Sequence, residues 1–296
     1  MNRLTLVLIA CAALLFALSA LSGTAPLPVD ETLSALFGQG DERIRTIVWE
    51  LRLPRAAAAF AVGAALGLAG AAMQGLLQNP LAEPGVLGVS AFSALGAVIA
   101  IFFGFGAVSS FAVPAAAILG AGAATILLAV AAVRGAGSVT LLLIGIGLSS
   151  IAGALMSLAL NLAPNPYSLS DLVNWMMGSV ANRSWLDLAL GAPGWLIGGA
   201  LVLMAGPGLR ALSLGEETAA SLGADPKRLR LLVIAGAALL TGSSVAVAGT
   251  IGFVGIVAPH VVRPFVKHDP QRLLVPSALL AGVILMAADM AVRLAP

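Results

Sequence analysis

Long apolar runs separated by short polar segments dominate the pattern of this chain. A helix rises 1.5 Å per residue, so about 20 apolar residues cross a hydrocarbon core of roughly 30 Å. Nine runs approach or reach that length, and we expect membrane spans at residues 4–21, 56–77, 86–103, 111–133, 139–162, 186–204, 231–247, 250–262 and 273–288. The eighth span is short and ends near a proline. The pattern predicts an all-α polytopic membrane protein with about nine transmembrane helices.

Two polar segments interrupt this pattern most strongly. Residues 22–54 contain five acidic residues and three arginines and predict a loop with one short surface helix over residues 29–37. Residues 206–230 form the most hydrophilic part of the second half of the chain. Residues 170–177, which include Trp175, predict a short helix at the membrane interface.

Small residues recur every four positions in the second predicted span. Gly63, Gly67, Ala71 and Gly75 would lie on one helix face, and this spacing lets two helices pack closely in lipid. The same spacing recurs in the fifth span. We therefore expect both helices to pack inside a bundle rather than to face lipid on every side.

An internal repeat relates the two halves of the chain. Gly63, Gly70 and Pro80 are separated by intervals of seven and ten residues, and the same intervals separate Gly242, Gly249 and Pro259. With the amino terminus inside, the first copy starts outside and the second starts inside, which indicates an inverted repeat of the kind many transporters have. We expect all of these glycines to be packing positions.

The distribution of cations favours that orientation only modestly. With the amino terminus inside, nine arginines and lysines fall on the inner side and six on the outer side. Residues 22–54 would then form an outer loop, and residues 206–230 a cytoplasmic loop.

Composition excludes several classes of protein. Hydrophobic residues make up 60% of the chain and charged residues 9%, against about 25% charged in a typical soluble domain. One transmembrane domain over residues 1–296 leaves no room for a soluble domain of ordinary size. A formal net charge of +2 gives no indication of a nucleic-acid partner. Cys11 is the only cysteine, which excludes an intrachain disulfide and a cysteine metal cluster. We expect no metal and no bound cofactor.

The first apolar run has an alternative interpretation as a signal peptide. It follows a short basic segment, and residues 8–11 imitate a lipoprotein cleavage site. We favour a first membrane helix, because the run is long enough to span and further spans follow.

The chain shows no catalytic pattern. An intramembrane serine protease could use Ser149 or Ser150 with His260 as the base, but serines among glycines at helical spacing are more typical of packing. Lys227 and Lys267 do not belong to a phosphate-binding loop. We therefore expect a protein that is not an enzyme and that depends on a separate subunit for any ATP hydrolysis.

Several motifs carry a resemblance to a known family. RLPR (52–55), VGAALGLAGAAMQGLLQNPLAEPGVLGVS (62–90), LLLIGIGLSS (141–150), NWMMG (174–178), GTIGFVGIVAPHVVR (249–263) and ADMAVR (288–293) resemble the FecCD family of ABC-importer permeases. The resemblance implies a type II importer permease of the bacterial inner membrane that carries an iron chelate (ferric siderophore or haem) or cobalamin. Implied partners are a second copy of the chain, two ATPase subunits and a periplasmic or lipid-anchored substrate-binding protein, with lipid around them. The family has ten helices, and we expect this sequence to lack the last of them.

The resemblance also implies roles for individual residues. Arginines on the outer face of such permeases meet acidic residues of the binding protein, and the matching positions are Arg52, Arg55 and Arg293. These arginines could instead be interfacial anchors. The family's cytoplasmic constriction corresponds to Asn79 and Leu81 on one side and to Ser138 and Val139 on the other.

The polar segment 206–230 resembles the family's coupling loop. We expect one amphipathic helix over residues 216–222, closed by Gly223, and a second helix from Pro226. Such a helix would dock in a groove of the ATPase. The residues implied in docking are Gly215, Glu216, Glu217, Ala219, Ala220, Leu222 and Gly223.

An ion-coupled secondary transporter is the main alternative. Transporters of that class place ionisable residues inside the membrane. Asp289 is the one candidate, and it lies four residues from Arg293, so we expect the two to pair on one helix face.

Overall fold

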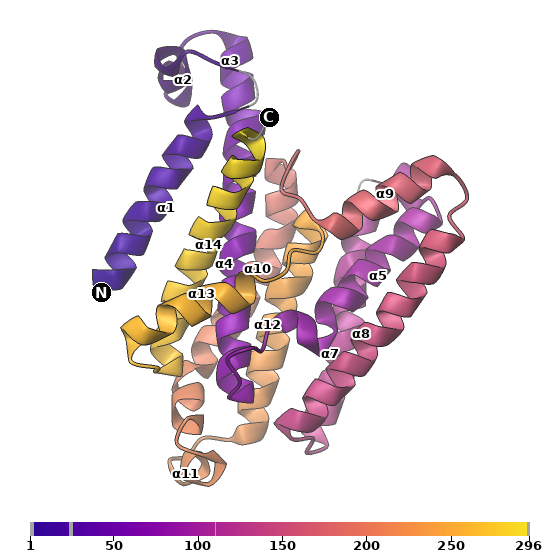
Figure 1. Ribbon diagram of the computed structural model, residues 1–296, viewed down its shortest axis with the longest axis vertical. Helices are drawn as coiled ribbons and strands as arrows, with labels where there is room; N and C mark the ends of the chain where they lie inside the picture. Colours follow the sequence, from indigo (N-terminus) through magenta and orange to yellow (C-terminus); the bar gives the residue numbers. More distant parts are fainter. Residues whose placement is uncertain (1–2, 24–25, 110, 295–296) are drawn as a thin grey trace.

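The computed structural model describes residues 3–23, 26–109 and 111–294, and every regular element in them is a helix (Figure 1). The long helices are α1 (Arg3–Leu21), α4 (Leu53–Leu77), α7 (Ala112–Val133), α8 (Ser138–Asn161), α10 (Trp185–Leu212), α12 (Pro226–Ala248) and α14 (Pro270–Leu294). Shorter elements are α2 (Val29–Leu36), α3 (Glu42–Thr46), the π-helix η1 (Ile47–Arg52), the 3₁₀ turn η2 (Pro84–Leu87), α5 (Val89–Phe102), α6 (Phe105–Val108), α9 (Pro166–Met177), α11 (Glu216–Ser221), α13 (Val254–Val262) and the 3₁₀ turn η3 (Arg263–Val266).

The all-α polytopic fold is confirmed, with seven helices of membrane-crossing length among the described residues. The third and eighth predicted spans are shorter than expected. Helix α5 has 14 residues and α13 has nine, about 21 and 14 Å of helix. Breaks in the backbone explain the difference: Gly88 has a φ of 75° before α5, and Gly249 and Phe253 have positive φ before α13. These two helices cross only part of the bundle.

The second long helix begins earlier than the hydrophobic pattern predicts. The chain is helical without a break from Glu42 to Leu77, so residues 42–54 extend a span instead of completing a loop. Asp41 caps the start by accepting a hydrogen bond from the Arg43 amide at 2.7 Å. The π-helical turn η1 ends at Arg52, two residues before Pro54, and proline can be accommodated where the hydrogen-bond ladder is shifted. Ile44, Ile47, Val48 and Leu51 stand at the helical spacing i, i+3, i+4 and i+7, a signal that the prediction of a loop left out.

Helices α4 and α12 form the centre of the molecule. Most of their residues are buried, and they pack against each other. Helix α10 packs against both, and α14 packs against α4. Helices α5 and α7 pack against α12 and carry α8 on their far side, at the right of Figure 1. Most of α8 is exposed in this single chain. Its outward side chains are apolar, among them Leu143, Ile151 and Leu158.

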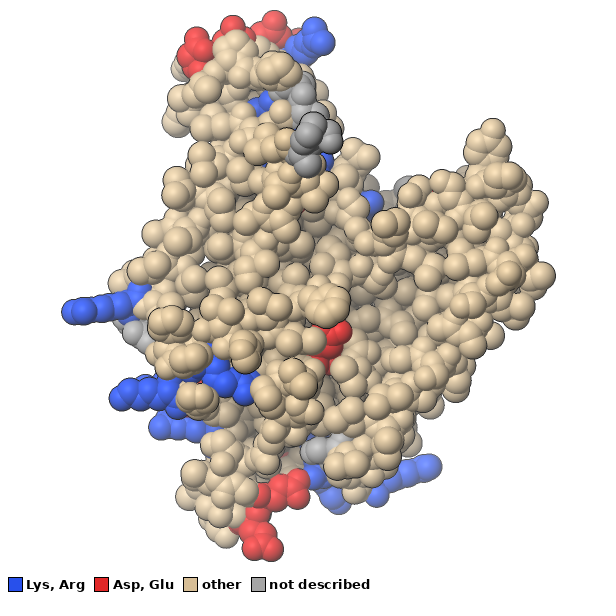
Figure 2. Space-filling view, in the orientation of Figure 1, with Lys and Arg blue, Asp and Glu red and all other residues tan. Residues whose placement is uncertain are grey.

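The helices run between two ends of the bundle. In Figure 1, α4 descends from the end that bears α2 and α3, whereas α12 and α14 ascend from the end that bears α11. Following the expected topology, we call the first the outer end and the second the inner end. Figure 2 shows cations gathered toward the inner end and a mixture of acids and cations at the outer tip.

The opposite directions of α4 and α12 agree with an inverted arrangement of the two halves. The matching intervals, however, do not fall on equivalent elements. Gly70 lies inside α4, whereas Gly249 follows the last residue of α12. Pro80 lies in the turn after α4, whereas Pro259 lies inside α13.

Candidate functional site

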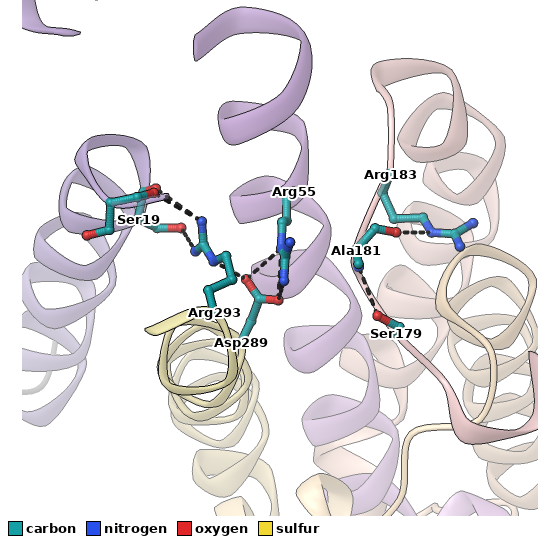
Figure 3. A network of polar contacts seen from close by, with 8 residues as sticks. Ser19, Arg55, Ser179, Ala181, Arg183, Asp289 and Arg293 are labelled. Atoms are coloured by element: carbon teal, nitrogen blue, oxygen red, sulfur yellow. Dashed lines mark hydrogen bonds and ion pairs between the residues drawn. The ribbon is translucent and has the colours of Figure 1, made fainter. Parts of the chain in front are cut away.

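The three arginines expected at the outer face lie together at the outer end. Arg52, Arg55 and Arg293 line one cavity of about 350 Å³, along with Arg183 and Glu50. Arg183 stands before α10, and its Nε donates to the Ala181 carbonyl at 3.2 Å (Figure 3). The sequence places Arg183 on the outer side but indicates no role for it, because only the fold brings the loop before α10 next to α4.

Two of these arginines flank one carboxylate. Arg55 Nη2 lies 2.7 Å from Asp289 Oδ1, and Arg55 Nε lies 3.1 Å from Oδ2. Arg293 Nε lies 3.1 Å from Asp289 Oδ2, and Arg293 Nη2 donates to Ser19 Oγ at 2.5 Å. Figure 3 shows the two guanidinium groups approaching Asp289 from different sides. The expected pairing of Asp289 with Arg293 is confirmed, and Arg55 joins it from another helix.

Arg52 is also held within the chain. Arg52 is only 5% exposed, and its Nη1 donates to the carbonyls of Ala20 at 3.1 Å and Leu21 at 2.7 Å. The expected outer arginines therefore fix the ends of α1, α4 and α14 to one another. Their role toward a binding protein stays a prediction. Reversing the charge of Arg52 would disturb the fold before it tested docking.

The polar segment at the inner end folds locally as its sequence suggests. Helix α11 begins after Gly215, with a φ of 100°, and Gly223 follows with a φ of 84°. Asp225 caps α12 by accepting from the Lys227 and Arg228 amides at 2.9 and 3.3 Å. These caps explain why a short helix forms between two long ones.

The apolar side chains of α11 do not form one exposed face as expected. Ala219 is 1% exposed and packs inward, whereas Ala220 and Leu222 are exposed. Glu216 forms an ion pair with Arg230, and Glu217 is exposed without such a pair among the described residues. Glu217, Ala220 and Leu222 are therefore the side chains that α11 leaves exposed, while Ala219 anchors α11 to the rest of the chain. Their contact with an ATPase stays a prediction.

The expected gate residues lie in two segments at the inner side. Asn79 accepts a hydrogen bond from the Leu81 amide at 2.9 Å and so shapes the turn after α4. The Leu81 side chain is 69% exposed. Ser138 starts α8, and the neighbouring Val139 is 73% exposed. Leu81 and Val139 thus present apolar side chains that this chain does not cover.

The glycines of α4 meet neighbouring helices at short range. A Cβ added to Gly63 would lie 2.5 Å from the Ala281 carbonyl oxygen, and one at Gly67 would lie 2.6 Å from that of Ser277. A Cβ at Gly70 would overlap the Gly255 carbonyl oxygen of α13. Gly75 is looser, since its nearest neighbours would lie at 3.4 Å. The distances from this glycine face to the neighbouring helices are therefore shortest near the middle of α4.

The other two expected packing glycines have different surroundings. A Cβ on Gly242 would lie 2.6 Å from the Ala121 Cβ of α7. Gly249 has a φ of 71° and lies against the Trp175 carbonyl oxygen of α9, so an L side chain would be strained there by both backbone and space.

The described residues contain no group of three or more His, Cys, Asp or Glu side chains able to hold a metal ion. The expectation that the chain binds no cofactor stays a prediction.

Comparisons with known proteins agree with this geometry. The model of a family described as the FecCD transport family matches residues 10–296. The vitamin B12 import system permease protein BtuC of Vibrio cholerae is 43% identical over 270 residues, covering 91% of this chain and 81% of that protein. The ABC transporter permease protein YvrB of Bacillus subtilis, itself uncharacterized, is 38% identical over 262 residues, covering 87% of this chain and 74% of that protein.

A solved structure is similar over almost the whole chain. It is a metal-chelate type ABC transporter in an inward-facing conformation, with a TM-score of 0.89 and 31% sequence identity. The match covers 99% of this chain and 91% of that one.

Proposed function

Because the chain belongs to the FecCD transport family and is a multi-pass permease subunit of a bacterial ABC importer, we propose that it carries an iron chelate or cobalamin across the inner membrane. The observation that supports this most directly is its 43% identity to a vitamin B12 permease over 91% of the chain. An ABC importer implies ATPase and binding-protein partners. Two ATPase subunits at the inner end, a binding protein at the outer end and a second permease copy complete the proposed assembly.

The exposed helix α8 is the proposed contact with the second copy. Gly147 and Gly153 lie on it, and a Cβ added to either would meet nothing within 4 Å. Small residues with open space let another helix approach closely in a membrane, where the hydrophobic effect does not drive helix association. The substrate would pass between the copies, near the exposed Leu81 and Val139.

The test of substrate is uptake by cells that lack their own permease. Cells carrying this chain with its ATPase and binding protein should accumulate labelled cobalamin, ferric siderophore or haem, and the same cells without the ATPase should accumulate none. The purified chain alone should hydrolyse no ATP. Uptake that persists without an ATPase and follows an ion gradient would instead support the secondary transporter.

The inner end offers a second test. Ala220→Asp places a charge on the exposed face of α11, and a charge buried without a partner in an interface costs several kcal/mol. We expect at least tenfold less ATPase to co-purify with the variant. Gln39→Asp adds the same charge at the outer tip and should leave the yield unchanged. Equal yields from both variants would remove α11 from the ATPase contact.

The outer end offers a third test, for which Arg183 suits better than Arg52. Arg183→Glu reverses a charge of the cavity that the arginines line without breaking the Asp289 network. We expect docking of an acidic binding protein to slow several-fold at low salt, with the difference shrinking as salt increases. Arg43→Glu, an exposed reversal on α3, should slow docking less. Indistinguishable rates for Arg183→Glu and the unchanged chain would place docking elsewhere.

A further inference from the structure

Exposed cations gather on one flank of the inner end. They come from the start of α1, the end of α10 and the turn between η3 and α14: Arg3, Arg210, Lys267 and Arg272. Figure 1 shows these segments at the left of the molecule, and Figure 2 shows cations projecting sideways from that side. The Arg210 and Arg272 side chains are 60% and 64% exposed. This flank therefore presents cations to its surroundings rather than to the rest of the chain.

The flank has one carboxylate against four cations. Asp269, whose side chain is 15% exposed, lies 3.4 Å from Arg210 Nε and 3.5 Å from Arg272 Nε. Among the residues that the structure describes, neither Arg3 nor Lys267 belongs to an ion pair. Four positive charges less one negative charge leave an excess of +3 on this flank.

The α11 segment, also at the inner end, has no such excess. Between residues 216 and 230, three cations stand against three acids: Lys227, Arg228 and Arg230 against Glu216, Glu217 and Asp225. Glu216 pairs with Arg230, and Asp225 accepts from the Lys227 amide. The excess positive charge is therefore a property of the flank and is not shared by the α11 segment.

Exposed apolar side chains lie one helical turn from two of the cations. Leu6 and Val7 follow Arg3 in α1, and Val275 follows Arg272 in α14; all three are exposed. Residues three or four apart share a helix face. Both helices thus present a cation at the inner end and an apolar side chain next to it, toward the middle of the bundle. A phospholipid has the matching order, with its phosphate at the interface and its acyl chains in the hydrocarbon core.

We propose that this flank binds an anionic phospholipid of the inner leaflet, with a phosphate held by Lys267 and Arg272. Basic sites between helices at the cytoplasmic side suit such headgroups, and each cation near the surface adds to the attraction. A lipid with two phosphates, such as cardiolipin, suits cations spread over three segments better than a lipid with one phosphate. Arg3 and Arg210 supply the remaining positive charge.

The lipid would act on the turn that starts α14. Lys267 and His268 have φ of 56° and 60°, left-handed conformations that are unfavourable for residues other than glycine. A headgroup held by Lys267 and Arg272 bridges this turn to the first turn of α14, so binding favours the conformation seen in the structure. We therefore expect bound lipid to stabilise the folded chain.

The test is thermal unfolding of the purified, delipidated full chain in detergent with added cardiolipin, phosphatidylcholine or inorganic phosphate. We expect cardiolipin to raise the unfolding temperature in a saturable way, and the other two additions to leave it unchanged. The double variant Lys267→Gln, Arg272→Gln should need roughly tenfold more cardiolipin, or more, for the same rise. The double variant Lys227→Gln, Arg228→Gln removes the same charge from the α11 segment and should respond as the unchanged chain does.

A third double variant, Lys267→Arg with Arg272→Lys, keeps both charges and should also respond as the unchanged chain does, which separates loss of charge from damage to the turn. The proposal is overturned if cardiolipin causes no rise in the unchanged chain, or if the two neutralised variants respond equally. An equal rise with phosphatidylcholine or with inorganic phosphate would also overturn it, because the ligand would then be any lipid or a free anion. No ATPase, binding protein or chelate takes part, so a negative result leaves the transport function standing.

Discussion

Asp289→Ala should destabilise the folded chain by roughly 3–5 kcal/mol, because it leaves buried guanidinium groups without their counter-charge. The Asp289 side chain is 6% exposed, and those of Arg55 and Arg293 are 21% and 5% exposed. A charge that loses its partner inside a membrane protein cannot recover its hydration shell. The measurement is unfolding of the purified chain in detergent, by heat and by denaturant, with the unchanged chain in parallel.

Asp269→Ala is the matched control at the other end of the same helix. Asp269 also has two arginine partners, but these side chains are 60% and 64% exposed. Pairs of that kind contribute about 0–1 kcal/mol. Asp269 also accepts from the Gln271 and Arg272 amides at the start of α14, and losing such a cap costs about 0.5–2 kcal/mol, so we expect a smaller total loss than in Asp289→Ala. Similar losses in the two variants would mean that the Asp289 network is as well solvated as a surface pair and does not hold the outer ends of the helices together.

The Asp289 network also constrains how a binding protein could dock. An acidic side chain entering the outer cavity must compete with Asp289 for Arg55 and Arg293, since both already hold that carboxylate. Arg183 is not part of this network. We therefore expect Arg183 to supply most of the first attraction, with the paired arginines contributing after the carboxylate contacts rearrange.

The sequence predicts most of the fold because membrane helices are coded locally. Residues 56–77 contain no charged residue and only one polar side chain, Gln74, and a run of that length has few alternatives in a bilayer. The extension from Glu42 to Leu53 is not part of that apolar run, because it carries two acidic residues and three arginines. Its helical signals are local but weaker: Asp41 is a cap, and Ile44, Ile47, Val48 and Leu51 recur at helical spacing. A prediction based on hydrophobic length therefore starts the span too late and leaves this segment as a loop.

The functional sites also differ in whether neighbouring residues or distant residues form them. The caps of α11 are predictable because Gly215, Gly223 and Asp225 act on their immediate neighbours. The pairing of Arg55 with Asp289 joins positions 234 residues apart, and no local pattern encodes it. The hydrogen bond from Arg263 to Gln74 is hidden from the sequence for the same reason, since 189 positions separate the two residues. An uncharged glutamine in an apolar helix is the one available signal.

The glycine face of α4 is only partly predictable from the sequence. Its spacing predicts a close neighbour but cannot say which one. The neighbours are α14 opposite Gly63 and Gly67 and α13 opposite Gly70. This assignment matters for mechanism, because α4 and α14 also share the Asp289 network at the outer end and line a common cavity at the inner end, to which α4 contributes Gln74 and α14 contributes Leu273. Movement of α4 relative to α14 would therefore change contacts at both ends of the bundle.

Gly67→Leu should therefore cost about 1–3 kcal/mol or more, the range measured when cores are overpacked. A Cβ at Gly67 would overlap the Ala281 Cβ and lie 2.6 Å from the Ser277 carbonyl oxygen, and that backbone oxygen cannot turn aside as a side chain can. Gly122→Leu in α7 is the matched control, because a Cβ there would meet nothing within 4 Å. We expect the first variant to lose thermal stability and expression while the control keeps both. If the two variants unfold at the same temperature, α4 and α14 separate readily at this point, and the glycine face does not hold them together.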